Sequence, residues 1–315
     1  MALDHYVSRV HLRNFYSPAL GERMYAVRKS DGKTFTPDAE SVCRIEEGST
    51  NAYLTHNRAV EEFLKSVEPQ YNSAIKKLTG GEIDAECIAV IAGFAAYVMT
   101  CSPAAMRIQS APLKAVLENS ARALDAANAL PPPPAVLGGA NLTELLQSGK
   151  IQFTVDPKYP QAIGIANILK MTLMLGNAGW DVLKNPFDDS PFFTSDFPAA
   201  IEESDDPRGL NRIVPLTPRL AIRIRRDASL KRDQDNFTFA RFRYRAHKIG
   251  RQELAAVNRL LVQCAEGLVF YRDDHSWVKP FIMKYASYRV EAQTRELPGP
   301  DGSLLIATQR IVARR

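Results

Sequence analysis

The sequence predicts an α+β protein, in which a helical N-terminal half packs against a mixed or antiparallel sheet formed mainly by the C-terminal half. Apolar residues recur at helical spacing through about residue 129. Short apolar or alternating runs typical of strands dominate after residue 180, and helices and strands follow one another in mixed order without an internal repeat. Hydrophobic content of 45% and charged content of 24% are ordinary for a folded chain of 315 residues.

Apolar periodicity and turn residues place the individual elements. The predicted helices span 57–78, 84–101, 106–129, 141–147, 160–176 and 250–266. The predicted strands span 24–27, 34–36, 151–155, 180–183, 192–194, 220–224 and 236–245, and a C-terminal hairpin joins 285–295 to 304–312. Pro69 interrupts the first helix, because proline lacks the amide proton that a helix needs.

Four consecutive prolines followed by a glycine pair set the best boundary in the chain. They divide it into an extended segment, a hairpin and helices over 1–129, a spacer over 130–142, and a strand-rich part over 143–315. We expect the two flanking parts to share one core.

Composition indicates a cytoplasmic protein. The four cysteines show no CxxC spacing, which favours reduced, buried thiols, and no signal peptide opens the chain. The uncharged segment 87–106 is long enough to cross a bilayer, but Gly93, Ser102 and Pro103 favour a buried helix, so no membrane contact is expected. The oligomeric state stays open.

Charge is strongly uneven near the middle of the chain. Residues 181–206 hold eight acids and one lysine, whereas residues 208–251 hold 13 Lys/Arg and three Asp. An acidic pocket beside a basic wall suits a phosphate and a metal, and it also suits a solvated surface.

Three candidate catalytic residues come from two segments. Asp196 and Ser195 lie at the end of a predicted strand, where a carboxylate can face a cleft. His5 lies on an N-terminal strand, where alternation would put it on the same face as Arg9, a candidate substrate-binding residue. The alternatives are a turn or helix cap for Asp196 and a hydrogen-bonded structural histidine for His5.

Metal ligation is the second candidate chemistry. Asp196, Glu61 and Glu68 would supply hard oxygen donors, which suit Mg²⁺ or Mn²⁺. Glu61 and Glu68 stack on one side of a predicted helix, and an ordinary ion pair with Lys65 is the alternative for Glu61.

Arginines that alternate along two predicted strands are the third candidate. Arg241, Arg243 and Arg245 would share one face of a strand, and Arg223 and Arg225 repeat the arrangement. Guanidinium rows suit phosphate groups, so nucleic acid or a nucleotide is the expected partner, although such rows also protect edge strands from aggregation.

Five segments resemble a bacterial family known as domain of unknown function 4238. They are His5-Tyr6-Val7 with Arg9 and Leu12 to Phe15, Ser102-Pro103, Trp180 to Asn185 leading into Thr194-Ser195-Asp196-x-Pro198, Pro215 to Pro218, and Asn258 in a helix that ends in Val269-Phe270-Tyr271. Ser8 and Phe197 depart from the family signature, which has Pro and Asn there. The resemblance covers most of the chain and implies no activity.

Three functions from different classes stay open. The first is a metal-dependent nuclease or phosphodiesterase, in which Asp196, His5 and a helix glutamate surround the metal. The second is a noncatalytic protein that senses or regulates by binding nucleic acid or a nucleotide. The third is a hydrolase or transferase of a phosphorylated or nucleotide-containing metabolite, with His5 and Asp196 as an acid and base pair.

Overall fold

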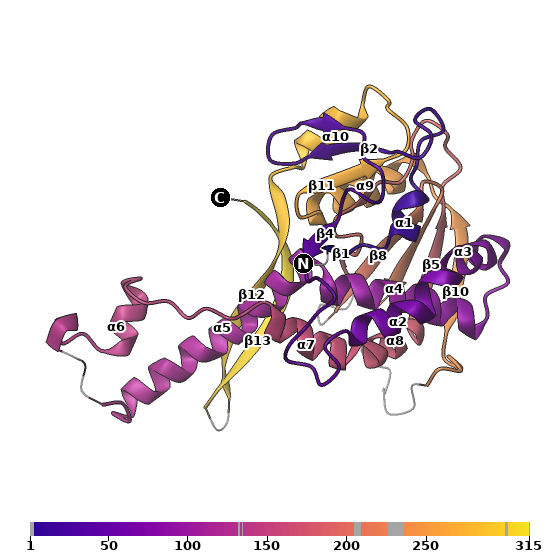
Figure 1. The fold of residues 1–315 in the computed structure, drawn as a ribbon. Helices are drawn as coiled ribbons and strands as arrows, with labels where there is room; N and C mark the ends of the chain where they lie inside the picture. Colours follow the sequence, from indigo (N-terminus) through magenta and orange to yellow (C-terminus); the bar gives the residue numbers. More distant parts are fainter. Residues whose placement is uncertain are drawn as a thin grey trace.

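A computed structural model describes residues 3–131, 133, 135–204, 209–225, 236–299 and 302–314 (Figure 1). The fold is mixed α+β, with most of the helices in the middle of the chain. Asp205 and Asp206 of the acidic stretch, and the part of the basic stretch over 226–235, lie outside the described residues.

A mixed five-stranded sheet forms the centre of the C-terminal part. Its strands follow the order β10 (Arg243–Lys248), β5 (Gly179–Lys184), β9 (Leu220–Arg225), β8 (Leu210–Thr217) and β7 (Ala200–Glu203). β10 runs parallel to β5, and the other neighbours pair antiparallel.

Strands from both halves of the chain build the second sheet. It contains β3 (Thr34–Phe35), β2 (Tyr25–Arg28), β11 (Leu268–Tyr271) and β6 (Thr194–Ser195). Two further pairs are β1 (Leu3–His5) with β4 (Arg44–Glu46), and β12 (Tyr288–Gly299) with β13 (Gly302–Ala313). The N-terminal half is therefore not purely helical, and its strands complete a sheet that the C-terminal half could not close alone.

Ten α-helices occur among the described residues. They are α1 (Arg9–Arg13), α2 (Ala59–Val67), α3 (Tyr71–Gly80), α4 (Ala85–Cys101), α5 (Pro103–Ala126), α6 (Leu142–Gln147), α7 (Lys158–Ala166), α8 (Ile168–Gly176), α9 (Arg251–Cys264) and α10 (Val278–Lys284). The expected break at Pro69 is confirmed by a 3₁₀ turn over Glu68–Gln70. Figure 1 shows α5, α6 and the β12–β13 hairpin extending away from the rest of the chain.

Helix α4 is buried along most of its length, as its uniformly apolar sequence predicts. Asp84 caps its first turn by accepting from the amide of Cys87 at 2.8 Å. Ser102 ends α4 and caps α5 by accepting from the amide of Ala105 at 3.2 Å, and Pro103 occupies the first position of α5. The Ser102-Pro103 motif is thus the junction of two helices.

No single helix among the described residues has the length and apolar character to cross a membrane. The segments Ala59–Gly80 and Ala85–Cys101 have that length and composition only as a pair, and the chain bends by 117° between them. All four cysteines are buried and unpaired, which confirms the prediction made from their spacing.

The largest hydrophobic cluster combines residues from before and after the proline spacer. It runs from Val60 on α2 to Val290 on β12 and includes residues of α4, α8 and α9 and of both faces of the five-stranded sheet, where Trp180 is fully buried. Helix α9 lies on the face opposite Trp180, because its Glu253 contacts Arg223 of β9 and His247 of β10.

Two predicted strands were wrong or misplaced. Residues 151–155 alternate in burial but pair with no strand in the described chain, because alternation alone supplies no hydrogen-bonding partner. The strand predicted over 236–245 begins only at Arg243, since a turn at Asn236 and a left-handed Phe239 (φ 49°) precede it.

Several helix boundaries also differ from the prediction. The N-terminal extended segment ends at His5 and gives way to α1, and the helix expected over 160–176 breaks at Asn167. Helix α9 ends at Cys264, so the Val269-Phe270-Tyr271 motif belongs to β11 rather than to the end of the helix. Strands β7 and β8 were not predicted.

Candidate functional site: an arginine face and an adjoining cleft

A fully buried aspartate organises the arginines of the five-stranded sheet. Asp181 of β5 lies directly opposite Arg245 of β10 on one side and Arg223 of β9 on the other. Its carboxylate accepts from Nε of Arg245 at 2.6 Å and from Nη2 of the same residue at 3.1 Å. We call Arg223, Arg225, Arg243 and Arg245, which share this side of the sheet, the arginine face.

Arg225 reaches the same carboxylate because its neighbour has no side chain. Its Nε lies 3.2 Å from Oδ1 of Asp181, and its strand partner is Gly179. A Cβ at residue 179 would lie only 3.1 Å from Nη2 of Arg225. Glycine at this position therefore leaves room for the guanidinium to fold along the sheet.

Arg223 is the most enclosed member of the arginine face and is neutralised within the protein. Its Nε lies 2.8 Å from Glu202 of β7, and its Nη1 lies 3.1 Å from Glu253 of α9. Burial opposes the charge, but the two carboxylates outweigh it and raise the pKa of the guanidinium. Arg223 thus fixes the sheet to α9 and is not available to a ligand.

Arg243 and Arg245 form the solvent-facing rim of the arginine face. The side chain of Arg245 is 64% exposed although it binds Asp181, and the bond to that carboxylate raises the pKa of Arg245. Arg243 is exposed and donates to the carbonyls of Ala240 and Phe242, without an ion pair to any described residue. The prediction that Arg241, Arg243 and Arg245 line one strand was wrong for Arg241, which precedes β10.

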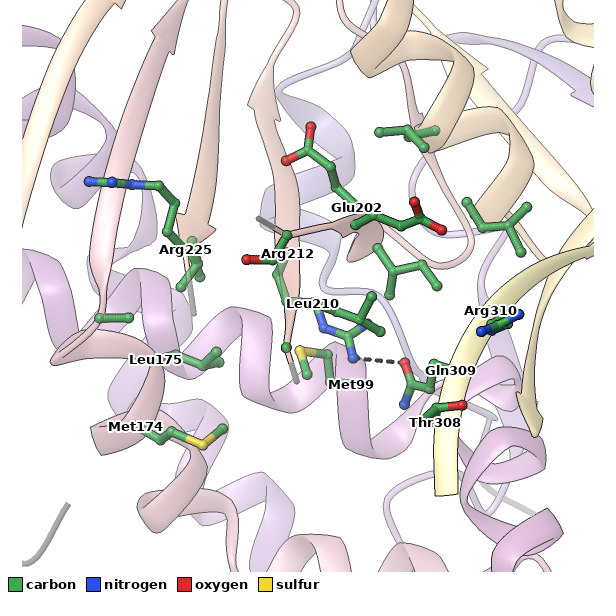
Figure 2. A pocket seen from close by; sticks show the side chains of 18 of the residues that line it. Met99, Met174, Leu175, Glu202, Leu210, Arg212, Arg225, Thr308, Gln309 and Arg310 are labelled. Carbon is green, nitrogen blue, oxygen red and sulfur yellow. Dashed lines mark hydrogen bonds between the residues drawn. The ribbon is translucent and has the colours of Figure 1, made fainter. Parts of the chain in front are cut away.

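A cleft of about 1110 Å³ adjoins the arginine face and shares Arg225 with it. Its walls come from β7, β8 and β9, the ends of α4 and α8, α9, and residues 307–311 of β13. Figure 2 shows Met99, Met174 and Leu175 along one side, and Arg225 and Arg310 at opposite sides of the view.

Four arginines and two glutamates line this cleft, so its walls carry an excess of positive charge. Arg212 of β8 donates to Oε1 of Gln309 on β13 at 2.7 Å, a bond that Figure 2 shows across the cleft. Arg259 of α9 and Arg310 of β13 are exposed and form no ion pair with any residue that the structure describes.

Asp196 does not line the cleft, and its side chain binds backbone amides. Its carboxylate accepts from the amides of Glu266, Gly267 and Leu268 at 2.8, 2.7 and 2.9 Å, which ties β6 to the loop between α9 and β11. The residue is 5% exposed. Burial raises the pKa of this carboxyl to about 6, although the three amides oppose the shift.

The hydroxyls beside Asp196 are also enclosed. Ser195 is fully buried, and its Oγ accepts from the amide of Phe197 at 3.1 Å. Thr194 lies 2.7 Å from Nε2 of His11, a buried histidine that also contacts the Tyr71 hydroxyl at 2.8 Å. These contacts are those of turn and core residues.

His5 and Arg9 are directed toward other partners. Nε2 of His5 lies 3.0 Å from the carbonyl of Ala39, and burial lowers the pKa of this imidazole. Arg9 forms an exposed ion pair with Glu40 at 2.6 Å. The expected shared strand face of these two residues was wrong, because β1 ends at His5 and Arg9 begins α1.

The two helix glutamates each have a partner within the protein. Glu61 accepts from Nε of Arg58 at 2.6 Å, and Glu68 accepts from the hydroxyl of Ser8 at 2.5 Å. No hydrogen bond or ion pair between described residues joins Asp196, His5 and either glutamate. In the described ranges, no group of three or more His, Cys, Asp or Glu side chains could hold a metal ion.

Several residues of this region were not predicted from the sequence. Asp181 was counted only as part of the acidic stretch, although an acid between Trp180 and Val182 in an apolar strand is itself a signal of a partnered buried charge. Arg212, Arg259 and Arg310 come from three separate elements. No local sequence pattern connects them.

A family model described as Protein of unknown function (DUF4238) matches residues 4–275. No curated protein and no solved structure matches the chain. The matched range contains the arginine face and ends before the β12–β13 hairpin.

Proposed function

The chain belongs to the DUF4238 family, whose function is unknown, and we propose that its arginine face binds the phosphate groups of nucleic acid or of a nucleotide. One observation carries the proposal. The buried carboxylate of Asp181 holds Arg245 and Arg225 in place on the sheet, while their side chains remain 64% and 43% exposed.

Fixed guanidinium groups are suited to phosphate. Asp181 uses two of the five N–H donors of Arg245, so the others can bind a second anion. Arginine loses less conformational entropy on binding when its position is already set, which favours affinity. Arg243, two residues before Arg245 on β10, adds a cation without a carboxylate partner among the described residues.

The geometry supports binding more than hydrolysis. Both carboxylate oxygens of Asp196 accept from backbone amides, Ser195 is buried, and His5 contacts a backbone carbonyl. A metal-dependent nuclease or phosphodiesterase would need several acidic or histidine ligands in one place, and the described residues offer no such group.

Fluorescence anisotropy with labelled single-stranded RNA, DNA and nucleotides tests the proposal. We expect the double variant Arg243→Gln with Arg245→Gln to weaken binding of the preferred ligand by at least about tenfold, since each charged contact contributes on the order of 1 kcal/mol. The matched control is Arg13→Gln with Arg122→Gln, which removes the same charge from two exposed positions on other elements.

Equal weakening in the two double variants would mean that net charge, and not the arginine face, governs binding. Gel analysis of the same mixtures with Mg²⁺ or Mn²⁺ adds a second criterion. Cleavage of RNA or DNA that is lost in Asp196→Ala would contradict a noncatalytic function.

A further inference from the structure

The cleft beside the arginine face has a floor made of flexible and branched aliphatic side chains. Met99 of α4, Met174 and Leu175 of α8, and Leu210 of β8 lie along it, and Ile224 of β9 continues it. None of the described residues that line the cleft is aromatic. Such a floor offers dispersion contacts to an alkyl chain but no ring on which a nucleobase could stack.

The polar part of the lining favours a negative charge. Arg259 and Arg310 have no carboxylate partner among the described residues. Glu202 is already paired with Arg223. Arg259 and Arg310 are therefore less neutralised than the arginines around Asp181.

Size separates a chain-bearing ligand from a simple ion. At about 1110 Å³ the cleft is slightly larger than most ligand sites, which are roughly 300–1,000 Å³. A lone phosphate or carboxylate would leave most of the aliphatic floor in contact with water. An anion that also carries an apolar body would cover it.

We propose that this cleft binds an amphipathic anion, in which a carboxylate or phosphate head contacts Arg259 and Arg310 and an aliphatic chain lies on the methionine and leucine floor. The site differs from the phosphate-binding arginine face in its ligand chemistry and shares only Arg225 with it. One wall comes from β13, beyond the residues that the family model matches.

Isothermal titration calorimetry with five probes tests this assignment, with the dodecyl compounds kept below their critical micelle concentrations. The probes are dodecanoate, dodecyl phosphate, dodecyl maltoside, adenosine monophosphate and inorganic phosphate. We expect one or both dodecyl anions to bind at least tenfold more tightly than the other three probes, and the stronger of the two identifies the head group. Tighter binding of adenosine monophosphate would overturn the aliphatic assignment, and equal binding of the maltoside would overturn the role of charge.

Two variants connect binding to the cleft. Arg259→Gln with Arg310→Gln removes two exposed cations without disturbing the core, and it should weaken the dodecyl anion at least tenfold. Leu210→Asp should do the same by placing a negative charge in the floor, while Arg13→Gln with Arg122→Gln should have no effect. Unchanged affinity in the first variant, with its melting temperature intact, would refute the proposal.

The same variants separate this site from the arginine face. Arg259→Gln with Arg310→Gln should leave RNA or nucleotide binding within about twofold of the parent protein, and Arg243→Gln with Arg245→Gln should leave dodecyl anion binding unchanged. A saturating dodecyl anion that displaces RNA fully would show that the two ligands share one site, and the proposal of a distinct cleft would fail.

Discussion

Replacing Asp196 with alanine should destabilise the protein rather than remove a reacting group. The substitution leaves the amides of Glu266, Gly267 and Leu268 without their acceptor. An unsatisfied buried donor costs about 1–3 kcal/mol. Two effects keep the total near the lower limit for three donors: burial already opposes the ionised carboxyl, and water can reach these half-buried amides. We therefore expect the free energy of unfolding to fall by about 3 kcal/mol at pH 7. With roughly 2.1 cal/mol/K of unfolding entropy per residue, the melting temperature should fall by about 4–5 °C.

Differential scanning calorimetry of the parent protein and the variant measures this change. Asp189→Ala is the matched control, because the side chain of Asp189 is 60% exposed and its carboxylate forms a surface ion pair with Arg251. Its loss should cost under about 1 kcal/mol, or less than about 1.5 °C. A melting temperature for Asp196→Ala within 1 °C of the parent would refute the assignment of Asp196 as the residue that holds the loop between α9 and β11.

Three further predictions follow from buried charged or titratable groups. Burial lowers the pKa of His11 from 6.5 to about 3, so the unfolded chain takes up a proton at higher pH than the folded protein does. The free energy of unfolding should therefore fall by about 1.4 kcal/mol per pH unit between pH 6.5 and 3. His11→Gln should lack this slope in urea unfolding, and parallel pH profiles of the two proteins would contradict the prediction. Lys29 donates to four carbonyls, at 2.7 Å to Val262 and Ala265, at 2.8 Å to Tyr288 and at 3.5 Å to Gln263. Lys29→Met should therefore cost about 2–4 kcal/mol in urea unfolding, and a loss below about 1 kcal/mol would show that these carbonyls find other donors. Asp181→Asn should lower the free energy of unfolding by about 2 kcal/mol. This is less than for a fully buried ion pair, because Arg245 is largely exposed. An unchanged urea midpoint would exclude Asp181 as the residue that holds the arginines.

Helices that bury one face were largely predictable, because their apolar spacing depends on local sequence. The break at Pro69, the buried α4 and the short α6 after the spacer all lie where the pattern indicated. Strands were harder, since a strand exists only where a partner pairs with it. Residues 151–155 show strand-like alternation without a partner, whereas β6 and β11 form because each pairs with a segment far away in the sequence.

The arginine face was predictable in part for the same reason. Alternation placed Arg223 with Arg225 and Arg243 with Arg245, and both pairs lie on strands as expected. The pairing order that brings β5 between β9 and β10 could not be predicted from local sequence, so the role of Asp181 was missed. The backbone partners of His5 and Asp196 could not be predicted from the sequence either, because a side chain that binds backbone and a catalytic side chain can be the same residue type.

The salt dependence of polyanion binding tests the central claim most directly. For single-stranded nucleic acid, the slope of log K against log salt concentration changes by about 0.7 for each phosphate contact that is lost. If Arg243 and Arg245 each contact a phosphate, Arg243→Gln with Arg245→Gln should make the slope about 1.4 less negative than that of the parent. A slope equal to the parent's, with affinity unchanged at every salt concentration, would show that phosphate groups do not bind the arginine face.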